Sequence, residues 1–181
     1  MQRVMIIGQP GSGKSTLARR LGEQTFLPVI HIDHIHWKPG WVERDPDEKT
    51  QMTLDVIQDP QWIFEGGHSK TYVQRLDRAD TLIWLDMPLG LRLRRVLWRT
   101  ARYFGRTRPD LPQGCPEQFS AEFLSFIWRT RHTSRARMQD LFHSAGADKA
   151  TYHFTRPHEV NTFLSDLGTA LAVGNLGIPH R

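Results

Sequence analysis

The residues with the clearest chemical meaning lie near the start of the chain. Gly8-Gln-Pro-Gly-Ser-Gly-Lys-Ser15 matches the pattern G-x-x-x-x-G-K-[ST] in full. Glycines let the backbone turn tightly and present N–H groups to phosphate oxygens, and the helix expected behind them adds a positive dipole end. A lysine here reaches the β- and γ-phosphates, and a serine hydroxyl ligates Mg²⁺. We therefore expect the phosphates of ATP to be held by Gly8, Gly11, Ser12, Gly13, Lys14, Ser15 and Thr16.

Three acids stand at the ends of short apolar runs that are typical of strands: Asp33, Glu65 and Asp86. In open α/β sheets, ligands bind outside the carboxyl ends of the strands. A carboxylate there orients Mg²⁺ or accepts a proton from an attacking hydroxyl. We expect Asp33 to contact the phosphate acceptor and Glu65 or Asp86 to orient Mg²⁺. A cap on the following helix is an equal alternative for Asp86.

Histidines and tryptophans cluster around the first of these acids. The alternation of histidine with Asp33 over residues 31–36 resembles a metal site, but no fourth ligand follows at a recognisable spacing. We expect these histidines to be structural or to face the substrate, and we expect His68, which follows Gly66-Gly67, to contact the substrate rather than a metal. Trp37 is a candidate for substrate contact. With Trp41 it either stacks on a base or closes a small core.

The basic residues are concentrated in one stretch of the chain. Residues 92–137 hold eleven arginines, no lysine and three acids, a net charge of +8, whereas the rest of the chain carries −3. Such a block is a solvated face, a nucleic-acid surface or a phosphate pocket. Arginine suits phosphoryl transfer because its planar fork stays charged. We expect Arg102, Arg106 and Arg108 to belong to a mobile lid and Arg129, Arg131 and Arg135 to share a later helix.

From these arguments, the groups expected to act on the transferred phosphoryl group are Lys14, Asp33, Arg102, Arg106, Arg108 and Arg135. Cationic stabilisation and positioning dominate this chemistry. The interleaved Trp98, Tyr103 and Trp128 keep a nucleic-acid surface open as the alternative, because aromatic rings stack on bases.

The elements that must position these residues follow from the apolar periodicity. Strands are expected over 3–8, 27–33, 61–65, 81–86 and 150–155, and helices over 14–26, 46–58, 88–103, 119–144 (one or two) and from 157 onward. Residues 34–41 and 105–116 are expected to be loops. Strands that alternate with helices predict an α/β protein with a parallel sheet covered on both faces.

The length and composition of the chain limit the classes of protein to which it can belong. The chain has 181 residues, a net charge of +5 and 39% hydrophobic residues. We expect one domain over residues 1–173 and a flexible tail over 174–181. A lone cysteine, Cys115, excludes an intrachain disulfide. The apolar runs are too short for a membrane span, and the first residues do not resemble a leader, so we expect a cytoplasmic monomer or homodimer.

Beyond these motifs, the chain resembles the adenylate-kinase-like proteins known as DNA topology modulation (FlaR-like) proteins. The resemblance rests on the segments Gly8–Thr16, Asp33 to Trp41, Glu65-Gly66-Gly67, Gly105–Asp110 and Gly114–Glu117. More distantly, the chain is similar to nucleoside monophosphate kinases and shikimate kinases. The resemblance implies a P-loop NTPase three-layer sandwich with a five-stranded parallel sheet in the order 2-3-1-4-5. It also implies an acceptor-binding insertion over about 34–60 and an arginine-rich lid over about 92–137.

The resemblance also implies roles for single residues. Gly66 and Gly67 fall near the Mg²⁺ and the acceptor in such kinases, and Arg156-Pro157 matches the loop that packs on adenine. GGHS stands here where adenylate kinases have G-F-P-R, so AMP is not implied as the acceptor. The leading expectation is a kinase that transfers the γ-phosphate of ATP, with Mg²⁺, to a small acceptor such as a nucleotide or nucleoside. The alternatives are an ATP-responsive DNA-binding regulator and a bare NTPase.

Overall fold

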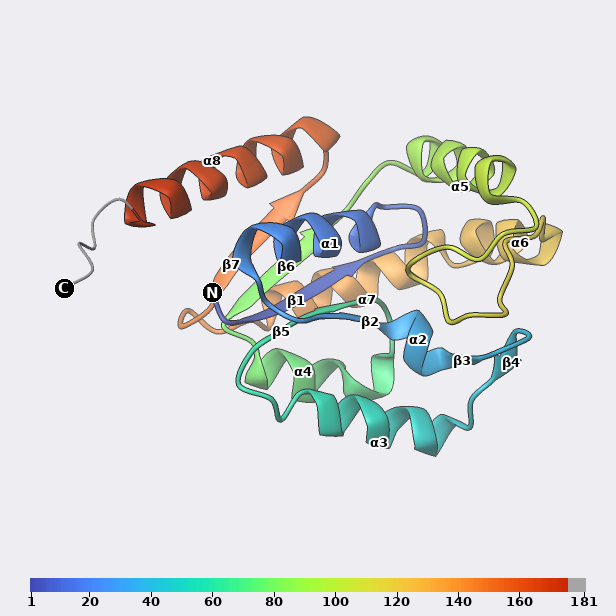
Figure 1. Ribbon diagram of the computed structural model, residues 1–181, viewed down its shortest axis with the longest axis horizontal. Coiled ribbons are helices and arrows are strands. Elements are labelled where there is room, and N and C mark those ends of the chain that lie inside the picture. The colour runs from blue at the N-terminus through green and yellow to red at the C-terminus, as the bar shows by residue number, and fades with distance from the viewer. Residues whose placement is uncertain (176–181) are drawn as a thin grey trace.

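A five-stranded parallel sheet forms the centre of the computed structural model, which describes residues 1–175 (Figure 1). Its strands are β1 (Arg3–Gly8), β2 (Val29–His31), β5 (Trp62–Glu65), β6 (Thr81–Leu85) and β7 (Ala150–Phe154). They lie in the order β2-β5-β1-β6-β7. Counted along the chain, this order is 2-3-1-4-5, so the predicted fold class is confirmed.

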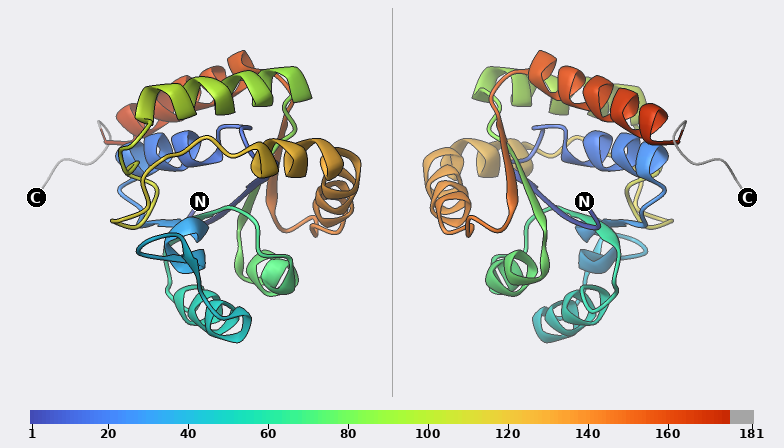
Figure 2. Two further views of the ribbon diagram at one scale, coloured as in Figure 1. Left: turned by 90° about the vertical axis from the view of Figure 1, so that its right-hand side faces the viewer. Right: turned by 90° about the vertical axis from the view of Figure 1, so that its left-hand side faces the viewer.

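Each face of the sheet has its own apolar core, because successive strand side chains point to opposite faces. Val4 and Ile6 pack with Leu17 and Leu21 of α1 (Lys14–Thr25) and Leu164 of α8 (Pro157–Asn175). On the other face, the core contains Met5, Ile7, Ile57, Leu76, Met138 and Leu141. That face is covered by α3 (Pro46–Val56), α4 (Tyr72–Arg78) and α7 (Arg131–His143), while α5 (Leu89–Tyr103) lies on the α1 and α8 side (Figure 2). The result is three layers.

The connection after β2 differs from the sequence expectation. The strand ends at His31, and the helix α2 (Ile32–His36) follows directly. Ile32 and Ile35 are both buried, a spacing of three that suits a helix rather than a strand. Residues 37–38, within the expected loop 34–41, then form β3 (Trp37–Lys38), which pairs antiparallel with β4 (Val42–Glu43) just after that loop. Asp33 therefore stands in the first turn of a helix instead of at the end of a strand.

The other helices follow the sequence more closely. Asp45 caps α3 by accepting hydrogen bonds from the N–H groups of Asp47 and Glu48. The stretch 119–144 forms two helices, α6 (Ala121–Arg129) and α7. The expectation that Arg129 and Arg135 share a helix is therefore wrong, because Arg129 ends α6 and Arg135 lies in α7. The helical segment η1 (Ser69–Thr71) to α4 was not predicted.

The C-terminal helix ends the described part of the chain. Helix α8 runs to Asn175, past the start of the tail expected at residue 174, and residues 176–181 lie outside the described residues. Within residues 1–175, no helix combines the length and apolar character that crossing a membrane requires.

Candidate functional site

A large pocket opens at the carboxyl ends of the central strands. Its volume is about 1570 Å³, which exceeds the size of typical single-ligand pockets and leaves room for a nucleotide beside a second small molecule. The phosphate loop, α2, the β3–β4 hairpin, the segment after β5, α5 and the loop 104–120 all contribute to its lining. Segments far apart in the sequence therefore meet at one place, as expected for an open α/β sheet.

The phosphate loop has the backbone conformation that its glycines predict. Gly11 and Gly13 have φ values of 78° and 103°, in the region that favours glycine. A Cβ at Gly11 would lie 2.5 Å from the carbonyl oxygen of Arg92, so α5 packs directly against the loop. No side chain caps the start of α1. Its first N–H groups are therefore available to an anion.

Basic side chains gather around this loop. Lys14 is half-buried, and its Nζ donates to the carbonyl oxygen of Gln9 at 3.4 Å. Burial lowers the pKa of Lys14 below its usual range, against the opposing effect of nearby Glu65 and Asp33. Arg95 donates from Nη1 to the carbonyl oxygen of Ser12 at 2.8 Å. The loop is thus bordered by cations from two helices.

The carboxylate of Glu65 meets the phosphate loop. Ser15 donates from Oγ to Glu65 Oε1 at 3.0 Å, and His31 Nδ1 lies 2.8 Å from the same oxygen. Glu65 is only 2% exposed. Burial lowers the pKa of His31, but the hydrogen bond and charge of Glu65 outweigh it, so that the pKa of His31 is raised. A hydroxyl and a carboxylate are thereby fixed next to each other, the hard oxygen donors that Mg²⁺ prefers.

Asp33 lines the same pocket and is half-buried. Burial, reinforced by the neighbouring Glu65 carboxylate, raises the pKa of Asp33 to about 6. Within the described residues, no hydrogen bond or ion pair reaches its carboxylate oxygens. Lys14 and Arg108 are close enough to favour its ionised form. Asp33 is thus a carboxylate that faces the pocket without a protein partner.

A buried arginine holds the segment after β5. Arg75 donates from Nη1 to the carbonyl oxygen of Gly66 at 3.0 Å and from Nη2 to that of His68 at 3.3 Å. Its guanidinium lies over the rings of Phe64 and Tyr72, 4.7 and 5.0 Å from their centroids. A side chain at Gly66 would clash with Ile32. The Gly66–His68 loop is therefore fixed by packing and hydrogen bonds from both sides.

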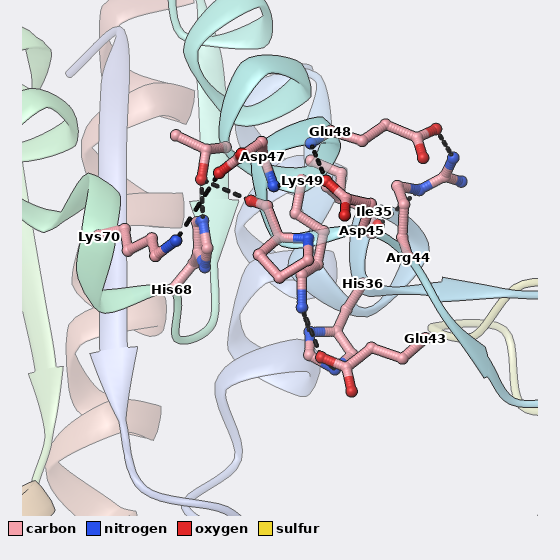
Figure 3. Close-up of polar contacts among 12 residues, drawn as sticks. Ile35, His36, Glu43, Arg44, Asp45, Asp47, Glu48, Lys49, His68 and Lys70 are labelled. Atoms are coloured by element: carbon pink, nitrogen blue, oxygen red, sulfur yellow. Dashed lines mark hydrogen bonds and ion pairs between the residues drawn. The ribbon is translucent and has the colours of Figure 1, made fainter.

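The region between α2 and α3 is a polar network (Figure 3). Lys49 is buried, and its Nζ lies 2.6 Å from Glu43 Oε1 and 3.5 Å from His36 Nδ1. His68 Nε2 lies 3.0 Å from Thr50 Oγ1. Burial lowers the pKa of both His36 and His68. This network ties the first turns of α3 to the pocket wall.

The β3–β4 hairpin is joined to the loop 104–120. Trp41 donates from Nε1 to the carbonyl oxygen of Pro116 at 2.9 Å, and the Gly40 N–H donates to the carbonyl oxygen of Gly114 at 2.9 Å. The Cys115 thiol donates to the Lys38 carbonyl oxygen at 3.4 Å. Trp37 and Trp41 pack edge to face at 5.3 Å and both line the pocket. Their packing against each other fits the small core, one of the two roles that the sequence left open.

Paired charges anchor the loop 104–120. Arg108 Nη1 lies 2.5 Å from Asp110 Oδ2, and its Nε lies 2.6 Å from Glu117 Oε2. Glu117 also accepts from Thr100 Oγ1 at 2.9 Å and lies 3.5 Å from Arg99. Arg108 and Glu117 are both buried. Residues of α5 thus hold the loop 104–120, which is part of the lid region expected from the sequence.

Most of the predicted site residues line this one pocket: Gly8, Gly11, Ser12, Gly13, Lys14, Ser15, Thr16, Asp33, Trp37, Glu65, Gly66, Gly67, His68, Arg102, Arg108 and Pro157. Arg106, Arg135, Arg156 and Asp86 are not among the lining residues. Arg135 instead forms a two-pronged ion pair with Asp86, whose carboxylate also lies 3.4 Å from His153. The Asp86 carboxylate is therefore already occupied by Arg135 and His153.

Sequence reasoning missed several pocket residues. Arg95, Arg99, Asp110 and Glu117 line the pocket and take part in the contacts above, and none was predicted as a site residue. One signal could have found the first two. Arg92, Arg95, Arg99 and Arg102 are spaced by three and four residues, which places them along one face of α5. In the part of the chain that the structure describes, no cluster of three histidine, cysteine or acidic side chains is arranged to hold a metal.

Comparison with known proteins supports a P-loop kinase-like protein. No family model matches the chain. It is 29% identical over 121 residues to a cytidylate kinase of Desulfurococcus amylolyticus, an alignment that covers 59% of this chain and 65% of that protein. The chain thus spans less than two-thirds of that relative.

The fold is that of solved P-loop kinases. Shikimate kinase from Bacteroides thetaiotaomicron superposes with a TM-score of 0.56 at 17% identity, over 94% of this chain and 98% of that one. Shikimate kinase from Acinetobacter baumannii, solved with shikimate, superposes with a TM-score of 0.55 at 15% identity, over 97% of this chain and 94% of that one. At these identities the likeness concerns the fold.

Proposed function

We propose that the protein is a phosphotransferase that moves the γ-phosphate of ATP to a small-molecule acceptor, with a nucleoside or nucleotide as the leading classes. One observation carries the proposal: Ser15 of the phosphate loop meets the buried Glu65, and the Asp33 carboxylate, which has no bonded partner in the described residues, lines the same pocket. This layout provides a donor end, where ATP would bind, and an acceptor end, where the molecule that receives the phosphate would bind. The likeness to a cytidylate kinase and to shikimate kinases supports the same class.

The phosphate loop would bind the triphosphate through its N–H groups and Lys14. Pro157, Val160 and Asn161 line the pocket at the start of α8, on the side where the resemblance to adenylate kinases places the base. Arg95, Arg99 and Arg102 project from α5 into the pocket lining. Charge develops on the transferred group, and cations held in place before the reaction stabilise it.

Ser15 and Glu65 fit a divalent cation, because the structure brings a hydroxyl and a buried carboxylate to one point beside the phosphate loop. When bound, Mg²⁺ would neutralise phosphate charge. His31 would keep Glu65 oriented through its hydrogen bond. Asp86, which pairs with Arg135, is left out of this proposal.

The first test is the Lys14→Ala variant. We expect ATP-dependent ADP formation to fall by at least 100-fold, because Lys14 would supply positive charge to the transferred phosphate. Lys70→Ala removes an exposed lysine outside the pocket lining and is the matched control. The measurement is ADP release in a coupled assay with a panel of acceptors. Unchanged turnover in Lys14→Ala would sink the proposal.

Two exposed tryptophans, each beside an arginine, favour a second candidate function, nucleic-acid binding. Trp98 and Trp128 are more than half exposed, and the guanidinium groups of Arg102 and Arg131 lie 5.2 and 4.2 Å from their ring centroids. Stacked rings and arginines are features of single-strand binding surfaces. This function predicts that the logarithm of affinity falls with the logarithm of salt, with a slope of about 0.7 per phosphate on single strands. Binding that is weak at low salt would exclude it.

A further inference from the structure

The residues at the acceptor end of the pocket include two carboxylates and contribute no lysine or arginine of their own. We define the acceptor wall as the pocket-lining residues of 32–41 and 65–72. Its members are Ile32, Asp33, His36, Trp37, Trp41, Glu65, Gly66, Gly67, His68, Ser69 and Tyr72. No lysine or arginine is among them. A phosphate monoester that docked on this wall would meet two acids, and the basic groups that act on Asp33 are Lys14 of the phosphate loop and the ion-paired Arg99 and Arg108.

Nearby basic residues are already engaged elsewhere. Lys49 pairs with Glu43, and Arg75 is committed to the carbonyl oxygens of Gly66 and His68. Lys38 lies 3.1 Å from Glu48, and Arg108 pairs with Asp110 and Glu117. Across the pocket, Arg137 of α7 is an exposed lining residue without a bonded partner in the described residues. It is the one basic side chain near Tyr72 that a charged acceptor could recruit.

The two classes of acceptor make opposite demands on this wall. A phosphate monoester brings an oxygen that is already ionised near neutral pH, needs no base, and requires cations to hold it. An alcohol is uncharged, and its proton must pass to a base as the new bond forms. Asp33 is a carboxylate without a protein partner, and Glu65 adds negative charge beside it. This arrangement suits the alcohol and disfavours the monoester.

We propose, on the footing that the protein is a kinase, that its acceptor is an alcohol that carries no phosphate and that Asp33 is the base. The alcohol oxygen bonds to the γ-phosphorus while the bond from that phosphorus to the β,γ-bridging oxygen breaks. ADP leaves with that electron pair, and the hydroxyl proton passes to an Asp33 carboxylate oxygen. Trp37, half-buried in the acceptor wall, offers a flat apolar surface to a ring-shaped acceptor. A nucleoside or a cyclic polyol meets this description, and a nucleoside monophosphate does not.

The experiment uses acceptors in matched pairs that differ only by a phosphate. The pairs are cytidine and CMP, adenosine and AMP, and neutral sugars and their phosphates, with shikimate as a phosphate-free alcohol bearing a carboxylate. ADP release and the phosphorylated product are both measured with the chain of residues 1–181. Asp33→Asn tests the base, Asp47→Asn is the control at an exposed acid outside the pocket lining, and Arg137→Ala tests the alternative anion contact.

The expected result is transfer to a phosphate-free alcohol. Its kcat should fall about 10²- to 10⁴-fold in Asp33→Asn, while KM changes little and Asp47→Asn behaves as the unmodified protein does. Conversion of a monophosphate to a diphosphate that survives Asp33→Asn and is lost in Arg137→Ala would overturn the inference and leave the kinase proposal intact. Transfer to an alcohol that is unaffected by Asp33→Asn would overturn the role of Asp33. ATP binding without transfer to any member of either panel would overturn both proposals.

Discussion

Single side chains at this site do more than one task. Glu65 accepts the Ser15 hydroxyl, contacts His31 and raises the pKa of Asp33, although it is almost fully buried. Burial of a carboxylate is costly unless partners satisfy it. Here the partners come from α1 and β2, so the same contacts that stabilise Glu65 also set the geometry of the donor end. The residue links a proposed metal site to a proposed base.

The raised pKa of Asp33 gives a prediction about pH. A base acts only in its ionised form, so kcat/KM should increase with pH up to about 6 and level off above it. The charged groups around Asp33 that set this value are Glu65, Lys14, Arg108, Asp110 and Arg99. The measurement is a pH–rate profile with the acceptor that proves active. Asp33→Asn should lack this limb, and a flat profile in the unmodified protein below pH 6 would contradict the assignment.

At the scale of elements, the arginine-rich α5 serves as a support for two loops. Its backbone packs against Gly11 of the phosphate loop, and its Arg99 and Thr100 reach Glu117 in the loop 104–120. The buried pair of Arg108 and Glu117 completes this anchorage. Removal of one partner of a buried ion pair leaves an uncompensated charge.

Glu117→Gln should therefore destabilise the protein by about 3 kcal/mol and free the loop 104–120. Urea unfolding measures the first effect, and the rate of trypsin cleavage at Arg106 measures the second. Glu23→Gln, at an exposed acid of α1, is the control. Equal cleavage rates in both variants would show that the pair does not hold the loop.

Elements were easier to predict from the sequence than contacts between them. Apolar runs identified all five strands of the sheet, and the helix starts at Asp45 and Pro157 follow from their local chemistry. The short helix α2 was missed because Ile30 and Ile32 alternate like a strand, whereas Ile32 and Ile35 follow a helical spacing. The contact of Ser15 with Glu65 joins residues that are 50 positions apart. It depends on the pairing of Ile6 with Glu65 in the sheet, which no local pattern encodes.

For the whole molecule, the distribution of charge matters more than its total. The net charge of +5 results from a basic region over 92–137 on an otherwise acidic chain. Much of that region faces the pocket, through Arg95, Arg99, Arg102, Arg108, Arg129 and Arg137. Cations focused in a cleft raise the local concentration of an anionic ligand and are screened by salt.

Binding of ATP should therefore stabilise the folded protein. At a ligand concentration of about 100 times Kd, mass action adds about 2.7 kcal/mol to the free energy of unfolding. For a chain of this size, that corresponds to a rise in Tm of about 5–10 °C. The measurement is thermal unfolding with and without ATP and Mg²⁺. Lys14→Ala should show a much smaller rise, and an equal rise in both proteins would argue against binding at the phosphate loop.

The hydrogen bond from Trp41 to Pro116 has a further consequence. Together with the contacts at Gly40 and Cys115, it makes the β3–β4 hairpin and the loop 104–120 one mechanical unit. A ligand that displaces either partner must carry the other with it. Occupancy at the two ends of the pocket is then reciprocally linked. Trp41 lies where the two segments meet, so the part of the fluorescence that a Trp41→Phe variant loses should respond to both ligands.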